Sequence, residues 1–178
     1  FEDRFKNEKL RVEWTWNYTT SDVKTELKKG KLLLSGTPKG DNPNVSVLAL
    51  RPQASDYVYE TRVANNNQAF KGLTMYGDAK SLLAWGTEGN RLILKSIKDG
   101  KETVLFESVL SVEKPYLHIK VQDGHRLNFY WSEDGKAWKK VNDEILDFGD
   151  LIRWDRVARP GLLHMGEENQ PAEFESFS

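Results

Sequence analysis

Short runs in which apolar and polar residues alternate recur along this chain, separated by Gly, Asp, Asn and Pro. The clearest run covers residues 116–132, where alternate apolar positions lie on both sides of Asp123-Gly124. These positions are Leu117, Ile119, Val121, Leu127, Phe129 and Trp131. A period of two gives a strand one apolar and one polar face, and Asp-Gly favours a tight turn because Gly takes positive φ at little cost. The run therefore predicts a β-hairpin.

The same pattern predicts strands over most of the chain. Two further turns with Asp-Gly fall at 98–101 and 133–136. Other predicted strands cover 31–35, 46–50, 57–64, 72–76, 81–85, 92–96 and 103–108. Helical periodicity is almost absent, and we expect one short turn at most within 142–150. About ten to thirteen short strands at this spacing indicate an all-β sandwich or jelly roll.

The two ends of the chain resemble each other. Residues 1–5 and 174–177 both begin and end with Phe and carry acidic residues between. Pairing them side by side would close the sandwich and cover a sheet edge. No repeat, linker or low-complexity stretch interrupts the pattern, so we expect a single domain over residues 1–178. The chain begins with Phe1 rather than Met, which we interpret as the start of an excised or processed segment.

Composition narrows the choice of partners. The formal net charge is -1, with 26 basic and 27 acidic residues, which gives no basic surface for nucleic acid. No run approaches the length of a transmembrane helix. The absence of cysteine excludes disulfides and thiolate metal sites. Asp3, Asp41 and Asp155 leave a structural Ca²⁺ open, although no ligand spacing selects them, and no other cofactor is expected.

The chain lacks the residue patterns of an enzyme complete in itself. A jelly-roll glycosidase needs two carboxylates about 5–10 Å apart, as a strand of the type Glu-x-Asp-x-Glu would provide. Glu173 and Glu175 share a strand face, but a row facing solvent is their ordinary role. The histidines are isolated, and neither a serine-nucleophile motif nor a phosphate-binding glycine loop is present.

Aromatic residues are the strongest functional signal, with six Trp, six Tyr and eight Phe. Proteins that bind sugars stack aromatic rings on the C–H faces of the sugar and flank them with amide and carboxylate groups. The core of a sandwich takes most of these rings. The alternation places Tyr76 on the side of its strand away from the core, and it places Tyr130 on a polar face with His118. Trp85 stays open between core and surface, so all three aromatic residues are candidates for carbohydrate contact.

Six motifs occur in the order found in a known module. They are Asp3-Arg4-Phe5 with Trp14-Thr15-Trp16-Asn17, Gly30-Lys31-Leu32-Leu33-Leu34, Phe70-Lys71-Gly72-Leu73, Tyr116-Leu117-His118-Ile119, Ser132-Glu133-Asp134-Gly135-Lys136-Ala137-Trp138, and Arg159-Pro160-Gly161-Leu162 with Ala172-Glu173-Phe174-Glu175-Ser176-Phe177. Together they resemble the C-terminal β-sandwich of family 43 glycoside hydrolases of the β-xylosidase and arabinofuranosidase type. Lys71 departs from the small residue usual at its position, and Glu175 replaces an aspartate.

The resemblance implies a concanavalin-like, lectin-like jelly roll of two antiparallel sheets that packs against a catalytic propeller acting on xylosides or arabinosides. It also implies a periplasmic or extracellular bacterial protein. In some members a loop of the sandwich places an aromatic residue at the rim of the active site. Phe70, which follows the polar stretch Asn65-Asn66-Asn67, is the candidate for that role. Trp16 and Asn17 of the opening motif complete the candidate residues.

Three functions remain open from the sequence. The first is an accessory module that stabilises a separate catalytic domain and rims its active site, with xylan or arabinan as the polysaccharide. The second is a free-standing carbohydrate-binding module with exposed aromatic rings. The third is a small jelly-roll glycosidase or lyase, which would need a cleft with convergent charged residues.

Overall fold

The computed structural model describes residues 1–43, 45–151 and 157–178. The elements in the first half of the chain are β1 (Ser21–Lys28), β2 (Lys31–Pro38), β3 (Val45–Ala49), β4 (Tyr57–Val63), β5 (Phe70–Asp78), β6 (Ser81–Glu88) and β7 (Arg91–Lys98). Those in the second half are β8 (Lys101–Val109), β9 (Tyr116–Gln122), β10 (Arg126–Ser132), β11 (Lys139–Lys140), β12 (Leu146–Asp147), the 3₁₀ turn η1 (Gly149–Leu151), β13 (Arg159–Met165) and β14 (Ala172–Phe177). The described residues contain no helix that is long and apolar enough to span a membrane.

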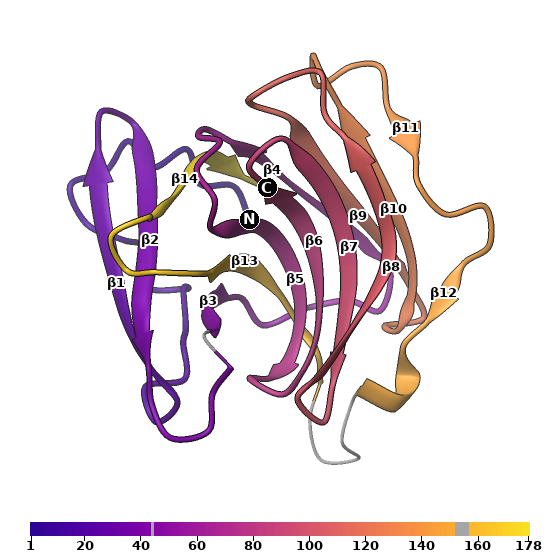
Figure 1. Cartoon of the computed structure of the whole chain (residues 1–178), viewed down its shortest axis with the longest axis horizontal. Helices are drawn as coiled ribbons and strands as arrows, with labels where there is room; N and C mark the ends of the chain where they lie inside the picture. Colours follow the sequence, from indigo (N-terminus) through magenta and orange to yellow (C-terminus); the bar gives the residue numbers. More distant parts are fainter. Residues whose placement is uncertain (44, 152–156) are drawn as a thin grey trace.

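The strands form two antiparallel sheets that face each other (Figure 1). We call sheet A the order β1-β2-β14-β4-β9-β10-β11, with β12 paired to β10, and sheet B the order β3-β13-β5-β6-β7-β8. In each sheet the C-terminal strands lie between strands from the first half of the chain. The prediction of an all-β sandwich of two antiparallel sheets is confirmed.

Alternation along the strands builds the core between the sheets. The inward residues of β9 and β10, predicted from their period of two, are buried except for Trp131, which is partly buried and packs against the core. Their hairpin turns where expected, with Gln122 opposite Arg126 and positive φ at Asp123 and Gly124. A second apolar cluster lies on the outer face of sheet B.

The two ends meet, but over a shorter length than predicted. Asp3 and Phe177 form one antiparallel bridge, with backbone N–H···O distances of 2.8 Å in both directions. The carboxylate of Asp3 is buried, and it accepts hydrogen bonds from the indole N–H of Trp14 and the backbone N–H of Phe5. The Trp14 ring in turn packs edge-on against Phe177. The opening and closing motifs therefore form one structural cluster.

Strand β1 is the longest element that the sequence pattern missed; the two-residue strand β12 was also missed. Strand β1 is an edge strand whose side chains are mostly exposed, and charged residues separate its two apolar positions, Val23 and Leu27. Charges on an edge strand discourage pairing with other chains. The same charges hide the apolar alternation on which the prediction of strands depended.

Candidate functional site

The six predicted site residues lie in four places. Trp16, Asn17 and Tyr76 belong to one corner at the edge of sheet B, whereas Tyr130 lies on the outer face of sheet A. Trp85 is in the core, and Phe70 lies on the outer face of sheet B at the start of β5.

The corner at Asn17 and Tyr76 joins a loop to the outer face of sheet B. Thr15 pairs with Ala49 at the edge of the sheet, which brings the next residues of the loop beside β3. The phenol of Tyr76 forms side-chain hydrogen bonds with Asn17 and Thr20. These bonds lower the pKa of Tyr76, but burial is the larger effect and raises it above the ordinary value. Tyr76 therefore stays neutral and can still donate its O–H.

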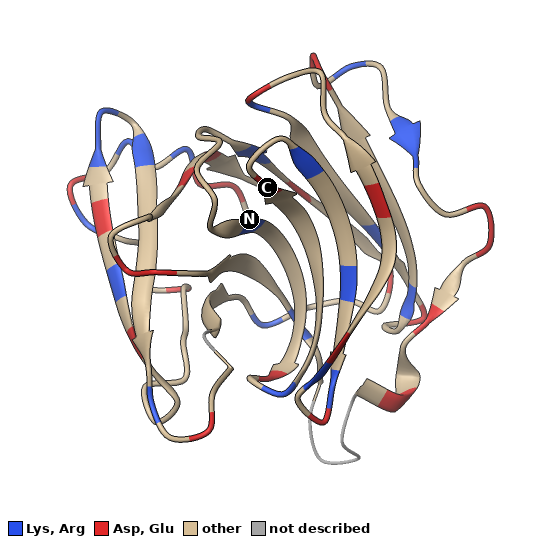
Figure 2. Cartoon of the chain, viewed as in Figure 1, with Lys and Arg blue, Asp and Glu red and all other residues tan. Residues whose placement is uncertain are grey.

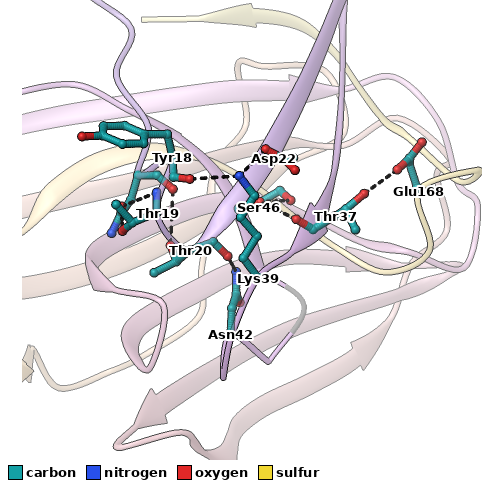
Figure 3. A network of polar contacts seen from close by, with 11 residues as sticks. Tyr18, Thr19, Thr20, Asp22, Thr37, Lys39, Asn42, Ser46 and Glu168 are labelled. Carbon is teal, nitrogen blue, oxygen red and sulfur yellow. Dashed lines mark hydrogen bonds and ion pairs between the residues drawn. The ribbon is translucent and has the colours of Figure 1, made fainter.

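A polar network fixes this corner (Figure 3). The side-chain oxygen of Asn17 accepts hydrogen bonds from the backbone N–H and the hydroxyl of Thr19, at 3.1 and 2.6 Å. The amide of Asn42 donates to the carbonyls of Thr20 and Val45, at 2.7 and 2.9 Å. Because the network ties the loop to sheet B, Trp16 is presented on an ordered backbone rather than on a free loop.

The network extends to the far edge of sheet A. Lys39 pairs with Asp22 and donates to the carbonyl of Tyr18, while the hydroxyl groups of Ser21 and Ser46 lie 3.1 Å apart. Glu168 accepts from Thr37 and Lys24 at the same edge. These residues come from β1, β2 and β3 and from the loops before β1, after β2 and before β14, so six parts of the chain hold the corner in place (Figure 3).

The residues of the corner differ in their exposure to solvent. Trp16 is 47% exposed, so much of its ring is open to solvent, whereas Tyr76 is only 8% exposed. The corner therefore combines an accessible indole with an adjacent, half-buried amide and an ordered loop. This is the chemistry that a sugar needs: an apolar ring to stack on and polar groups for its hydroxyls.

Tyr130 belongs to a second aromatic group on the outer face of sheet A. Its ring packs edge-on against His118, with ring centroids 5.3 Å apart, and His118 lies 5.0 Å from the ring of Trp138. Burial lowers the pKa of His118, and hydrogen bonding to Glu60 opposes that shift. Tyr130 is partly exposed and its ring is already engaged with His118, which leaves less of it for a ligand than Trp16 has.

Three of the predicted contacts are wrong because the side chains are buried: Tyr76, which is 8% exposed, and also Trp85 and Phe70. Trp85 is 0% exposed; it packs against Phe106 and Phe129 and donates its indole N–H to the carbonyl of Tyr130. Phe70 is 2% exposed, with the ammonium of Lys95 4.5 Å from its ring centroid. Phe70 is the first residue of a strand rather than the tip of an exposed loop, and a sugar cannot reach either ring.

A pocket of about 700 Å³ at one end of the sandwich was not found from the sequence. It lies between the N-terminal segment, the loop after β3 and strand β4, and it includes Phe1, Arg11, Thr15 and Tyr57. The guanidinium of Arg11 lies over the ring of Phe1 at 4.4 Å and forms an ion pair with Glu13. Leu10, Val12 and Trp14 alternate regularly with polar residues, so the pattern predicts a buried Val12, whereas Val12 is 95% exposed; nothing in this stretch of sequence signalled the pocket.

Charged groups are dispersed rather than gathered at a reaction centre (Figure 2). Glu173 and Glu175 form ion pairs with Lys31 and Arg62, at 3.0 and 2.6 Å. Among the described residues no three His, Cys, Asp or Glu side chains come together as a metal site. Two of the residues considered for Ca²⁺ have other partners: Asp41 forms an ion pair with Lys80, and Asp3 accepts a hydrogen bond from the indole N–H of Trp14. The third, Asp155, lies outside the described residues.

The fold and the corner define a concanavalin-like sandwich with an exposed aromatic residue at a sheet edge. The family model described as "Beta xylosidase C-terminal Concanavalin A-like domain" matches residues 2–177. The chain belongs to this family, which confirms the resemblance found in its motifs. No curated protein sequence matches the chain.

Solved structures share the fold at low sequence identity. One is the GH43 protein BlXynB from Bacillus licheniformis, with a TM-score of 0.77, 16% identity and coverage of 99% of this chain. Another is xylan beta-1,4-xylosidase from Bacillus halodurans C-125, with a TM-score of 0.73, 21% identity and the same coverage. This chain spans only 38% of the length of each. The carbohydrate-binding module CBM66 from Bacillus subtilis differs: at a TM-score of 0.58 and 16% identity, 93% of this chain matches 96% of that one.

Proposed function

We propose that this chain is an accessory module of a family 43 glycoside hydrolase, which stabilises and helps to shape the active site of a separate catalytic domain acting on xylan or arabinan. The observation that carries the proposal is the family match over residues 2–177 in a chain that corresponds to about two fifths of the similar enzymes. It is supported by Glu173 and Glu175, the two acidic residues on one strand face, because each is engaged in an ion pair, with Lys31 and with Arg62.

The test compares the whole polypeptide with and without this module. Removal of residues 1–178 is expected to lower kcat/KM for short xylo- or arabino-oligosaccharides at least about tenfold, because a shifted active-site wall misplaces the substrate. The matched measurement is thermal unfolding of the catalytic domain in both forms. Unchanged kinetics together with an unchanged melting temperature would remove the accessory role.

A carbohydrate-binding module is the second candidate, and the exposed Trp16 favours it. If the chain binds glycan on its own, Trp16→Ala is expected to weaken binding about tenfold or more, as loss of an aromatic anchor does. Isothermal titration of the isolated chain with xylan and arabinan oligosaccharides measures the effect.

The matched control for Trp16→Ala is Tyr130→Ala, which removes a partly exposed ring from the other sheet. We expect Tyr130→Ala to leave the affinity unchanged. If Tyr130→Ala weakens binding and Trp16→Ala does not, the binding surface is the outer face of sheet A. No heat of binding for any of these glycans would reject the second candidate.

A further inference from the structure

A row of polar side chains crosses the inner face of sheet B near one end. In the ladders His164 lies opposite Lys71, and Lys71 lies opposite Thr87, so the three side chains point to the same side of neighbouring strands. All three are buried, and Lys71 is 0% exposed. Polar groups inside a sandwich core are costly unless each finds a hydrogen-bond partner.

The ammonium group of Lys71 donates two hydrogen bonds to the loop before β5. Its Nζ donates to the carbonyls of Asn67 and Ala69, at 2.7 and 2.8 Å. A lysine ammonium carries three N–H donors, so one of them is left for a further acceptor. The loop is also tied to the turn before β14, because Asn65 and Asn67 both donate to the carbonyl of Pro171.

Three buried polar atoms around Lys71 have no partner among the described residues. They are Oδ1 of Asn67, Oγ1 of Thr87 and Nδ1 of His164. The Nε2 atom of His164 lies 3.0 Å from the carbonyl of Gln170, which can only accept, so the ring carries its proton on Nε2. Burial lowers the pKa of His164 and Lys71 adds to this, while hydrogen bonding to the backbone of Gln170 and Glu167 opposes it; the net shift is downward, so the ring is neutral and Nδ1 is an acceptor.

Burial of Lys71 gives the protein a pH signature. Burial lowers the pKa of Lys71 to about 8 from an ordinary value of 10.5, with Glu88 opposing the shift and the neutral His164 beside it. Between these values the unfolded chain binds more protons than the folded one, so the free energy of unfolding rises with pH. Denaturant titrations at pH 7.5 and 9.5 should show this rise in the wild type and a smaller rise in Lys71→Met. Equal slopes would contradict the burial of a charged Lys71.

We propose that Asn67, Lys71, Thr87 and His164 enclose a binding site for one buried water molecule inside the sandwich. The groups offer two acceptors, one spare N–H donor and one hydroxyl that can do either. An anion would meet the two acceptors, and a cation would meet the ammonium, so the set fits a ligand that both donates and accepts. Buried water typically makes about three hydrogen bonds to such groups.

The site would join the loop before β5 to three strands of sheet B. It goes beyond the proposed function, because it does not depend on a glycan or on a catalytic domain. Lys71 stands where the family resemblance has a small residue, so the site is a feature of this chain. A water molecule bound at this site would fix the position of Phe70, where β5 begins.

The direct test is water-selective NMR on the intact chain. We expect nuclear Overhauser effects of the sign given by long-lived bound water at the protons of Thr87 and Lys71, and a His164 ring protonated on Nε2. A Thr87 hydroxyl and His164 ring without such effects would overturn the proposal, as would a proton on Nδ1 at neutral pH.

The second test is whether one substitution, Thr87→Val, lowers or raises the folding equilibrium constant. If Thr87 bonds to a buried water, Thr87→Val should lower the folding equilibrium constant about fivefold, as loss of a buried hydrogen bond does. Thr74→Val is the matched control, because Thr74 is equally buried and its hydroxyl donates to the carbonyl of Leu83 at 2.7 Å. If the Thr87 hydroxyl has no partner, Thr87→Val should instead raise the constant, and the proposal fails.

Discussion

Trp85→Ala is expected to lower the free energy of unfolding by about 4 kcal/mol, within the range for removing a large aromatic side chain from a core. The ring is fully buried between the sheets, with centroids 6.0 Å from Phe129 and 6.3 Å from Phe106. The substitution also removes the donor that satisfies the carbonyl of Tyr130. Urea or guanidinium unfolding followed by circular dichroism measures the change.

Two controls separate packing from ligand contact at Trp85. Trp85→Phe keeps most of the ring volume and should recover part of the lost stability, whereas Trp16→Ala should change stability by less than about 1 kcal/mol, because Trp16 lies at the surface. A Trp85→Ala protein that keeps its stability and loses only glycan binding would show that Trp85 is a ligand residue after all.

Gly86→Ala is expected to destabilise the protein by about 3 kcal/mol, the upper end of the usual cost of overpacking. A Cβ atom at this position would collide with the carbonyl oxygen of Lys71 and lie 2.9 Å from Cζ of Phe70. One of these contacts is with the backbone of the neighbouring strand β5, which cannot move without opening the ladder. The measurement is again equilibrium unfolding by denaturant.

Gly149→Ala is the matched control for Gly86→Ala. The three described atoms nearest to a Cβ at Gly149 would be side-chain atoms at 3.3 Å or more, and Gly149 does not have positive φ. We expect its effect to be below about 1 kcal/mol. If both substitutions cost the same, the close approach of β5 and β6 is not what requires glycine at position 86.

The fold could be predicted from the alternation of apolar and polar residues and from the turn residues, because both depend on residues that are neighbours in the sequence. The hairpin at Asp123-Gly124 and most strands of sheet B follow directly from a period of two, because one face of each strand meets the core. The alternation did not reveal β1, because the exposed charged residues of this strand mask its period of two. The similarity of the two ends overstated their pairing, which reduces to the single bridge of Asp3 and Phe177.

The site was less predictable because burial depends on distant parts of the chain. The alternation placed Tyr76 on the outer side of sheet B, but the loop with Asn17 and Thr20 that covers its hydroxyl comes from far earlier in the sequence. Phe70 follows three asparagines, which indicated an exposed loop. The amides of Asn65 and Asn67 instead bond to the turn before β14, and Phe70 enters the sheet under Lys95.

The bridge between Asp3 and Phe177 places both ends of the module at one point of its surface. A polypeptide joined before Phe1 and another joined after Ser178 would therefore depart from the same place, and the sandwich could be inserted into a longer chain without separating its neighbours. The same proximity makes the module suitable for circular permutation. A short linker from Ser178 to Phe1 would let new ends be opened at an exposed turn such as Asp99-Gly100.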